Sequence, residues 1–270
     1  MSQRSIIIDC DPGKDDAIAL LLALASPNEL QVIGITCVAG NVPVELTYLN
    51  ALRICELANR TDVPVCRGCT LPFLRPLVTA ESVHGKSGME GCGLPPPSYH
   101  GDCRHAVDFI IENCLAAKDG EIKLCAVGPL TNIALAIIQE RRIVPKIREI
   151  VLMGGAATCP GNTTPVAEFN IFVDPHAAKV VFNSGLEITM FGLDVTHKVL
   201  TMPDRLEAIR VHNTPVTNAV AGMLNLYGRK RIAHNGLVGG PLHDPCVIAH
   251  LIDGEIFSGR KVHIDIELVS

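Results

Sequence analysis

Four aspartates lie within eight residues near the start of the chain: Asp9, Asp11, Asp15 and Asp16. They surround Pro12-Gly13, a pair that breaks the chain sharply. Carboxylates gathered this closely repel one another unless a cation joins them. Their hard oxygen atoms suit Ca²⁺ or Mg²⁺. The spacing therefore predicts a metal site, because complementing a helix dipole would explain only Asp15 and Asp16.

The elements around these aspartates predict where the site lies. Residues 6–8 form a β-branched run typical of a short buried strand, and residues 15–25 form an apolar helix with acids in its first turn. Ligands bind at the carboxyl ends of strands in an open α/β sheet. Polar or glycine motifs also follow three later predicted strands, at Asn41, Gly128 and Gly154. We expect these motifs to share one edge of the sheet with Asp11.

Strand and helix alternate along the whole chain, which predicts an α/β fold with an open, mostly parallel sheet and helices on both faces. The remaining predicted strands cover residues 30–38, 63–65, 122–127, 147–153, 186–191 and 262–269. The remaining predicted helices cover residues 43–58, 105–117, 174–185, 203–211 and 215–232. Another follows the motif of residues 128–132 and runs to about residue 140, and a last one opens at Asp244-Pro245. Residues 68–101 are rich in Pro and Gly and predict a long functional or mobile loop. Gly85-Lys86-Ser87 in this loop lacks the earlier glycine and strand of a nucleotide-binding loop.

Composition excludes several classes of function. The 270 residues are 48% hydrophobic, enough for the core of a single domain over residues 1–270. A net charge of -5, 4% aromatic residues and no Trp argue against nucleic-acid binding. The N-terminus lacks the order of a signal peptide, and the apolar run of residues 17–25 is too short for a bilayer. We therefore expect a cytoplasmic protein without a membrane partner.

Eleven cysteines are many for a chain of this length. Most lie in apolar patterns, where Cys acts as a small hydrophobic residue, and we expect reduced thiols. Cys66 and Cys69 have a metal-type spacing, with Cys92 and Cys103 as conceivable partners. The second pair has the wrong spacing for a zinc ribbon, so a structural zinc site is disfavoured.

The ordered motifs resemble those of the inosine-uridine-preferring nucleoside hydrolases. The resemblance rests on the acidic stretch of residues 9–17 and on later motifs at residues 39–41, 127–132, 151–155, 168–170 and 243–245. It runs from residue 6 to about residue 268. The family cleaves the N-glycosidic bond of ribonucleosides, giving ribose and a free base. The overall similarity, including residues 192–198, is closest to pyrimidine-preferring members.

This resemblance implies a Rossmann-like nucleoside hydrolase fold, a ribonucleoside substrate, a homo-oligomer and a set of site residues. Ca²⁺ would be held by Asp11, Asp16, Asp244 and the backbone carbonyl of Val127, together with the ribose 2′- and 3′-hydroxyls. Asp11 would act as the general base, and His243 as the proton donor to the leaving base. Substrate-binding residues would be Asp15, Asn41, His84, Met153, Asn162, Glu168, Phe169 and Asn170.

The chemistry of these residue types fits that reaction. Departure of the base leaves an oxocarbenium-like ribose, whose positive charge nearby carboxylates stabilise. A metal ion acidifies a water, and Asp11 can accept its proton. This matches the inverting arrangement of glycosidases, with a nitrogen-linked base in place of an oxygen-linked sugar.

Several of these residues have plainer interpretations from position alone. Asn41 could merely end a strand. Glu168 and Asn170 could be solvated loop residues. Met153 could belong to the core, and His243 could simply start a helix.

Two departures from the family pattern bear on these expectations. Members often place an aromatic residue nine positions before the aspartate of the His-Asp pair, where this chain has Asn235. One stacking wall that a purine would use more is thereby lost, which favours uridine and cytidine over inosine. The family also usually continues for several tens of residues past the position of Ser270. We therefore expect a domain that is short at its C-terminus.

Two other functions fit parts of the sequence. A Mg²⁺-dependent phosphohydrolase could use Asp9 as a nucleophile, but it needs a phosphate-binding Lys or Ser and a second acid pair that are not evident. A non-catalytic ribose- or nucleoside-binding protein could use the same fold. The intact Asp11 argues against binding alone, whereas Asn235 and the short C-terminus argue for it.

Overall fold

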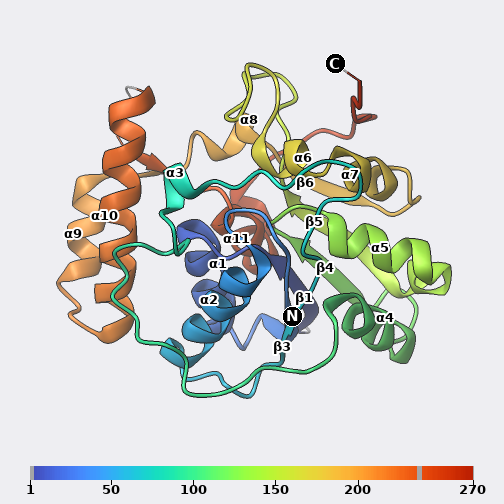
Figure 1. Cartoon of the computed structure of the whole chain (residues 1–270), viewed down its shortest axis with the longest axis horizontal. Helices are drawn as coiled ribbons and strands as arrows, with labels where there is room; N and C mark the ends of the chain where they lie inside the picture. The colour runs from blue at the N-terminus through green and yellow to red at the C-terminus, as the bar shows by residue number, and fades with distance from the viewer. Residues whose placement is uncertain (1–2, 236–238, 270) are drawn as a thin grey trace.

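A six-stranded parallel sheet forms the centre of the molecule (Figure 1). The computed structural model describes residues 3–235 and 239–269, with side chains described except for residues 226–238. The strands are β1 (Arg4–Cys10), β2 (Leu30–Cys37), β3 (Val65–Arg67), β4 (Ile122–Ala126), β5 (Ile147–Met153) and β6 (Ile188–Phe191). Their order is β3-β2-β1-β4-β5-β6. The expected α/β fold is confirmed.

Helices cover both faces of this sheet. The longer ones are α1 (Lys14–Leu24), α2 (Val44–Leu57), α4 (Ala106–Ala116), α5 (Thr131–Gln139), α7 (Pro175–Phe182), α9 (Pro203–Arg210), α10 (Pro215–Asn235) and α11 (Pro245–Ile252). Shorter elements are α3 (Glu81–His84), α6 (Phe169–Val173), α8 (Leu193–Thr196), the 3₁₀ turns Arg141–Lys146 and Gly254–Ile256, and the small hairpin of β7 (Leu200–Thr201) and β8 (Gly240–Pro241). No helix within the described ranges has the length and apolar character needed to cross a membrane.

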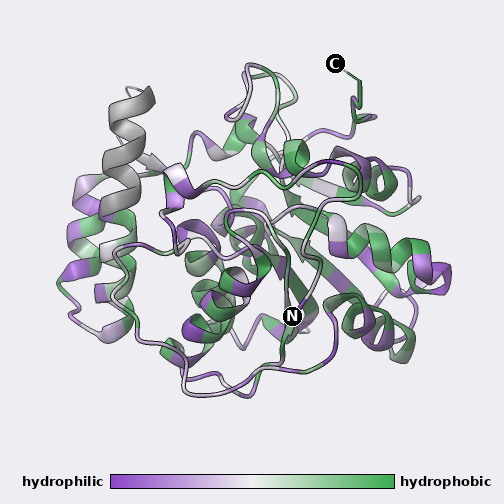
Figure 2. Ribbon diagram, viewed as in Figure 1, coloured by the Kyte–Doolittle hydropathy of each residue, from purple (hydrophilic) through white to green (hydrophobic). Residues whose placement is uncertain are grey.

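Alternating side chains of β1 build two cores. Ile6 and Ile8 point into the core shared with α1, α2 and α11, and Ile7 points into the core shared with α4, α5 and α7. Parallel strands covered on both faces need such continuous apolar runs. Figure 2 shows the hydrophobic colouring concentrated in the strands and the helix faces that cover them.

The strand order reverses beside β1, and this reversal determines where the site forms. From β1 the chain crosses to β2 on one side, whereas β4 adds on the other. A crevice opens outside the carboxyl ends of the strands at such a point. Asp11 follows β1 and Val127 follows β4, so both lie at this crevice. The predicted clustering of motifs at one edge follows from this topology.

The predicted strand over residues 262–269 was wrong. Ile264, Ile266 and Leu268 do pack onto the core beside α7, and the residues between them are exposed. Lys179 on α7 also pairs with Asp265. However, none of the described strands pairs with this segment. Alternating burial against a helix layer produces the same sequence pattern as a strand.

Candidate active site

The turn after β1 is folded around the carboxylate of Asp16. Its Oδ1 accepts the N–H of Asp11 at 3.1 Å, and its Oδ2 accepts the N–H of Gly13 at 2.9 Å. These bonds satisfy backbone groups at the start of α1, and the helix dipole favours an acid there. Asn41 Nδ2 adds a third contact, at 3.1 Å to Asp16 Oδ2. Asp16 therefore shapes the turn and fixes the direction in which Asp11 leaves the strand.

Asp11 lies in a close-fitting, fully buried space between the loops after β2 and β4. The N–H of Asn41 donates to its Oδ2 at 2.6 Å. A Cβ atom at Gly40 would stand 2.1 Å from Oδ2, and one at Gly128 would stand 2.7 Å from Oδ1. Only glycine permits this approach of backbone to carboxylate. The glycines of both motifs are thus explained by the position of Asp11.

Three carboxylates meet next to this turn. Oxygen atoms of Asp15, Asp16 and Asp244 lie within 4.8 Å of one another, and Asp244 directly precedes α11. This is the only group of three or more acidic, His or Cys ligands within the described ranges, so the zinc alternative at Cys66 and Cys69 gains no support.

Burial and mutual repulsion make these acids hard to ionise together. Burial raises the pKa of Asp11, Asp16 and Asp244, and neighbouring carboxylates raise those of Asp11 and Asp244 further. Asp11 Oδ1 is buried and accepts no hydrogen bond from the described residues. A divalent cation would offset both the burial of these carboxylates and their mutual repulsion. Carboxylate oxygens are ligands that suit a hard cation.

The opposite wall of the cavity is organised by Glu168 and Asn170, around the start of α6. The Glu168 carboxylate accepts N–H groups from Gly155 at 3.0 Å, from Asn170 at 2.9 Å and from Ile171 at 3.2 Å. Asn170 Nδ2 donates to the carbonyl oxygens of Val127 at 3.0 Å and Met153 at 3.1 Å. The sequence suggested a loop at these residues, but Glu168 is the N-cap of a short helix. That helix ties the ends of β4 and β5 together.

His84 closes the side of the cavity formed by the loop of residues 68–101. It lies on α3, and its Nδ1 accepts the N–H of Lys14 at 3.1 Å. The fully buried Lys14 also donates from Nζ to the carbonyl of Val83 at 3.3 Å. A neutral imidazole that accepts at Nδ1 carries its proton on Nε2. The long loop is therefore held directly by Lys14, the first residue of α1.

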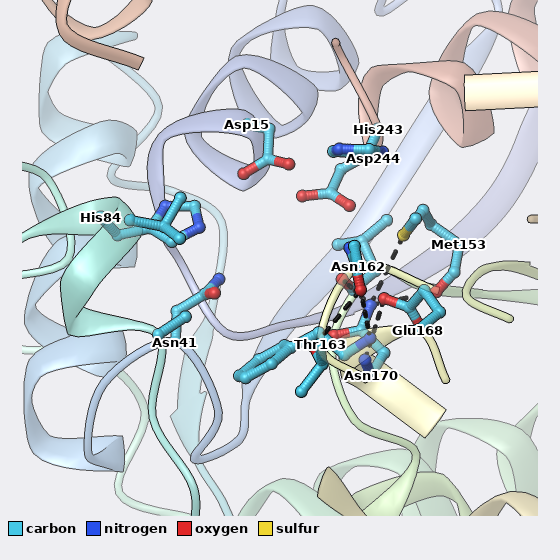
Figure 3. Close-up of a pocket in the computed structure, with 14 residues that line it drawn as sticks. Asp15, Asn41, His84, Met153, Asn162, Thr163, Glu168, Asn170, His243 and Asp244 are labelled. Atoms are coloured by element: carbon cyan, nitrogen blue, oxygen red, sulfur yellow. Dashed lines mark hydrogen bonds between the residues drawn. The ribbon is translucent and has the colours of Figure 1, made fainter. Parts of the chain in front are cut away.

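All eight predicted substrate-binding residues line one cavity, together with Val127, His243 and Asp244 (Figure 3). Figure 3 shows Asp15 and Asp244 near each other, with His84 and Asn41 on one side and Met153, Glu168 and Asn170 on the other. Asp11 and Asp16 are fully buried and are not among the residues that line the cavity. The side chain of Asn235 is outside the described side chains.

Sequence reasoning missed three residues of the lining: Ala80, Val83 and Thr163. Val83 and Thr163 are the immediate neighbours of predicted site residues, so adjacency alone could have suggested them. Ala80 carries no chemical signal. It reaches the cavity because its backbone N–H donates to the carbonyl of Asn41 at 3.0 Å.

Comparisons with known proteins agree with this geometry. A model of the inosine-uridine preferring nucleoside hydrolases matches residues 6–270. The pyrimidine-specific ribonucleoside hydrolase RihA of Shewanella baltica is 47% identical over 271 residues, which cover 99% of this chain and 83% of that protein.

Solved structures lead to the same family. The purine-preferring ribonucleoside hydrolase from Gardnerella vaginalis has a TM-score of 0.94 at 32% identity, covering 99% of this chain and 85% of that one. The plant nucleoside hydrolase PpNRh1 has a TM-score of 0.89 at 31% identity, covering 95% of this chain and 81% of that one. This chain therefore belongs to the inosine-uridine preferring nucleoside hydrolases, metal-dependent enzymes that cleave the N-glycosidic bond of ribonucleosides.

Proposed function

We propose that this enzyme is a calcium-dependent hydrolase that favours uridine and cytidine over inosine. The observation that carries the proposal is the buried group of Asp15, Asp16 and Asp244, of which Asp15 and Asp244 line a cavity together with amide and carboxylate side chains. Carboxylate and carbonyl oxygens are the ligands that Ca²⁺ takes in proteins. Asp11, Asp16, Asp244 and the carbonyl of Val127 would hold the ion.

Different residues of this chain would carry out the separate steps of the reaction. A bound divalent cation would polarise a water and the hydroxyls of the sugar. Asp11, whose buried Oδ1 accepts no hydrogen bond from the described residues, would accept the proton of the attacking water. Asp15, Asn41 and the residues around α6 hold the ribose in a fixed orientation, which lowers the entropic cost of reaction. The surrounding negative charge stabilises the sugar as it becomes cationic.

Support for a pyrimidine preference comes from the relatives. The relative named as pyrimidine-specific is 47% identical to this chain, whereas the structure named as purine-preferring is 32% identical. His84 and His243, which both line the cavity, are the side chains that we expect to face the nucleobase.

The free cysteines support a cytoplasmic enzyme, because eleven reduced thiols persist best in a reducing compartment. We further infer that residues 1–270 act as one domain, since both cores are built on the same sheet. A homo-oligomeric state and the absence of a nucleic-acid partner stay predictions from the sequence.

A panel of nucleosides, assayed for released ribose, tests the preference. We expect kcat/KM for uridine and cytidine to exceed that for inosine. The 2′-deoxyribonucleosides should be poor substrates, because groups that bind the 2′-hydroxyl would be left unpaired. Faster inosine hydrolysis would overturn the preference, and no ribose from any ribonucleoside would overturn the hydrolase itself. Phosphate release from uridine monophosphate, run in parallel, would favour the phosphohydrolase alternative.

A further inference from the structure

The short helix α8 contacts the cavity through Thr196. This threonine is 0% exposed, and its Oγ1 lies 2.8 Å from Nδ1 of His243, which is itself 3% exposed. The His197 ring also stands 5.7 Å from the His243 ring in an edge-on arrangement. The motif of residues 192–198 therefore meets the candidate active site directly, although its sequence alone suggested no role.

The direction of the Thr196–His243 hydrogen bond follows from the surroundings of the hydroxyl. A helical threonine can donate to a carbonyl three or four residues back. Here those carbonyls, Gly192 and Leu193, accept the backbone N–H groups of α8 and His197. Among the described residues, the hydroxyl bonds only to His243 Nδ1. If it accepted a proton from Nδ1, its own buried proton would lack a partner, which is costly.

The hydroxyl therefore donates to Nδ1, and this fixes the tautomer of a neutral His243. A neutral imidazole has one donor nitrogen and one acceptor nitrogen. With Nδ1 accepting, the proton is on Nε2, at the far side of the ring from Thr196. A neutral imidazole N–H can stabilise developing negative charge as a hydrogen-bond donor without giving up its proton.

We propose that Thr196 is a positioning residue that holds His243 in the Nε2–H tautomer, so that this N–H donates to the departing nucleobase. The proposal rests on the proposed nucleoside hydrolase function. As the N-glycosidic bond breaks, its electron pair passes to the base, and the Nε2–H group stabilises that charge by a hydrogen bond. The base takes its final proton from water.

Comparing Thr196→Val with Thr196→Ser distinguishes the effect of the hydroxyl group from the effect of the side-chain shape. Valine keeps the volume and loses the donor, whereas serine keeps the donor. We expect Thr196→Val to lower kcat for uridine by roughly 10- to 100-fold. This is less than the roughly 10²–10³-fold cost of deleting a transition-state donor, because the ring remains. Thr196→Ser should stay within about threefold of the wild type, since it restores the same bond.

A riboside with a nitrophenolate leaving group distinguishes positioning of His243 from a general structural effect. Nitrophenolate departs without a hydrogen-bond donor, so Thr196→Val should change its hydrolysis little. Adding Thr196→Val to His243→Ala should cause no further loss on uridine, because the two residues act through one group. Thr47→Val is the matched control. Thr47 is also fully buried and donates to the carbonyls of Val38 and Val44, so its change should leave the uridine-to-nitrophenyl ratio unaltered.

The ¹⁵N shifts of the His243 ring give a readout independent of activity. In the wild type they should report Nδ1 as the acceptor and Nε2 as the protonated nitrogen, and Thr196→Val should remove that bias. The proposal is overturned if the wild-type ring carries its proton on Nδ1, if Thr196→Val leaves uridine hydrolysis unchanged, or if it slows both ribosides equally. If the wild type hydrolyses neither riboside, the proposed function fails, while the ¹⁵N measurement still decides the role of Thr196.

Discussion

At the scale of single residues, Asp11 has the features of a general base. It is held at Oδ2 by the N–H of Asn41, while Oδ1 accepts no hydrogen bond from the described residues. Burial and the charge of Asp16 raise its pKa, so it gains a proton more readily than an exposed carboxylate. Asp11 must be ionised to take a proton from water, and a bound divalent cation would favour that form.

Replacing Asp11 with asparagine tests this role. The amide keeps an oxygen for the Asn41 N–H but cannot accept a proton. We expect kcat for uridine to fall by about 10²–10⁴-fold, the usual range for a lost general base. KM should change far less. Asp108→Asn, an exposed acid in the first turn of α4, should behave as the wild type. A kcat close to that of the wild type in Asp11→Asn would mean that another group activates the water.

At the scale of elements, the loop of residues 156–167 depends on one acid of α8. Asp194 accepts the N–H groups of Ala157 at 2.9 Å and Thr158 at 2.8 Å, and also the Thr158 hydroxyl. This loop carries Asn162, whose Oδ1 accepts the N–H of Phe169 at 2.9 Å. The helix that holds His243 through Thr196 therefore also anchors the loop that lines the other side of the cavity.

Asp194→Asn should loosen that loop without altering any of the proposed metal ligands. Hydrogen bonds to a charged acceptor contribute about 1.5–3 kcal/mol, and the amide retains part of this. We expect KM to rise by about 3- to 10-fold for uridine and cytidine alike, with a smaller change in kcat. Initial-rate kinetics on both substrates measure this, with Asp204→Asn, an exposed acid on α9, as the control. An unchanged KM would show that the loop does not need the Asp194 charge.

Elements differ in how far the sequence predicts them. Asp11, Asn41 and Gly128 could be assigned to one edge because each follows a buried parallel strand, and strand ends of one sheet must converge. The contact between Thr196 and His243 joins segments 47 residues apart in the chain, and no local pattern signals it. The strand predicted over 262–269 failed for a related reason, since pairing depends on a neighbour that the local pattern does not specify.

At the scale of the whole molecule, the buried acids set how stability depends on pH and metal. Burial raises the pKa of Asp9 from 3.8 to about 7, and those of Asp11 and Asp244 also lie well above their ordinary value. The folded protein therefore holds protons that the unfolded chain has already lost. These protonated carboxyl groups stabilise the folded protein fully below pH 3.8. That stabilisation is lost as the pH rises through about 7 and above.

Calcium should reverse that loss by favouring the charged carboxylates. We expect Ca²⁺ to raise Tm in calorimetry, and to raise it more at about pH 8 than at about pH 5, because protons compete with the ion at the lower pH. Comparing samples with chelator and with Ca²⁺ at each pH cancels the contributions of distant groups. An equal Tm increase at both pH values would contradict a site made of these acids.

Ribose release from uridine, measured before and after exhaustive chelation, decides whether this hydrolase needs a divalent cation. The group of Asp15, Asp16 and Asp244 is built from hard oxygen donors, so activity should depend on a hard divalent cation. We expect chelated enzyme to release no ribose, and added Ca²⁺ to restore the original rate. Full turnover of uridine by metal-free enzyme would contradict this expectation.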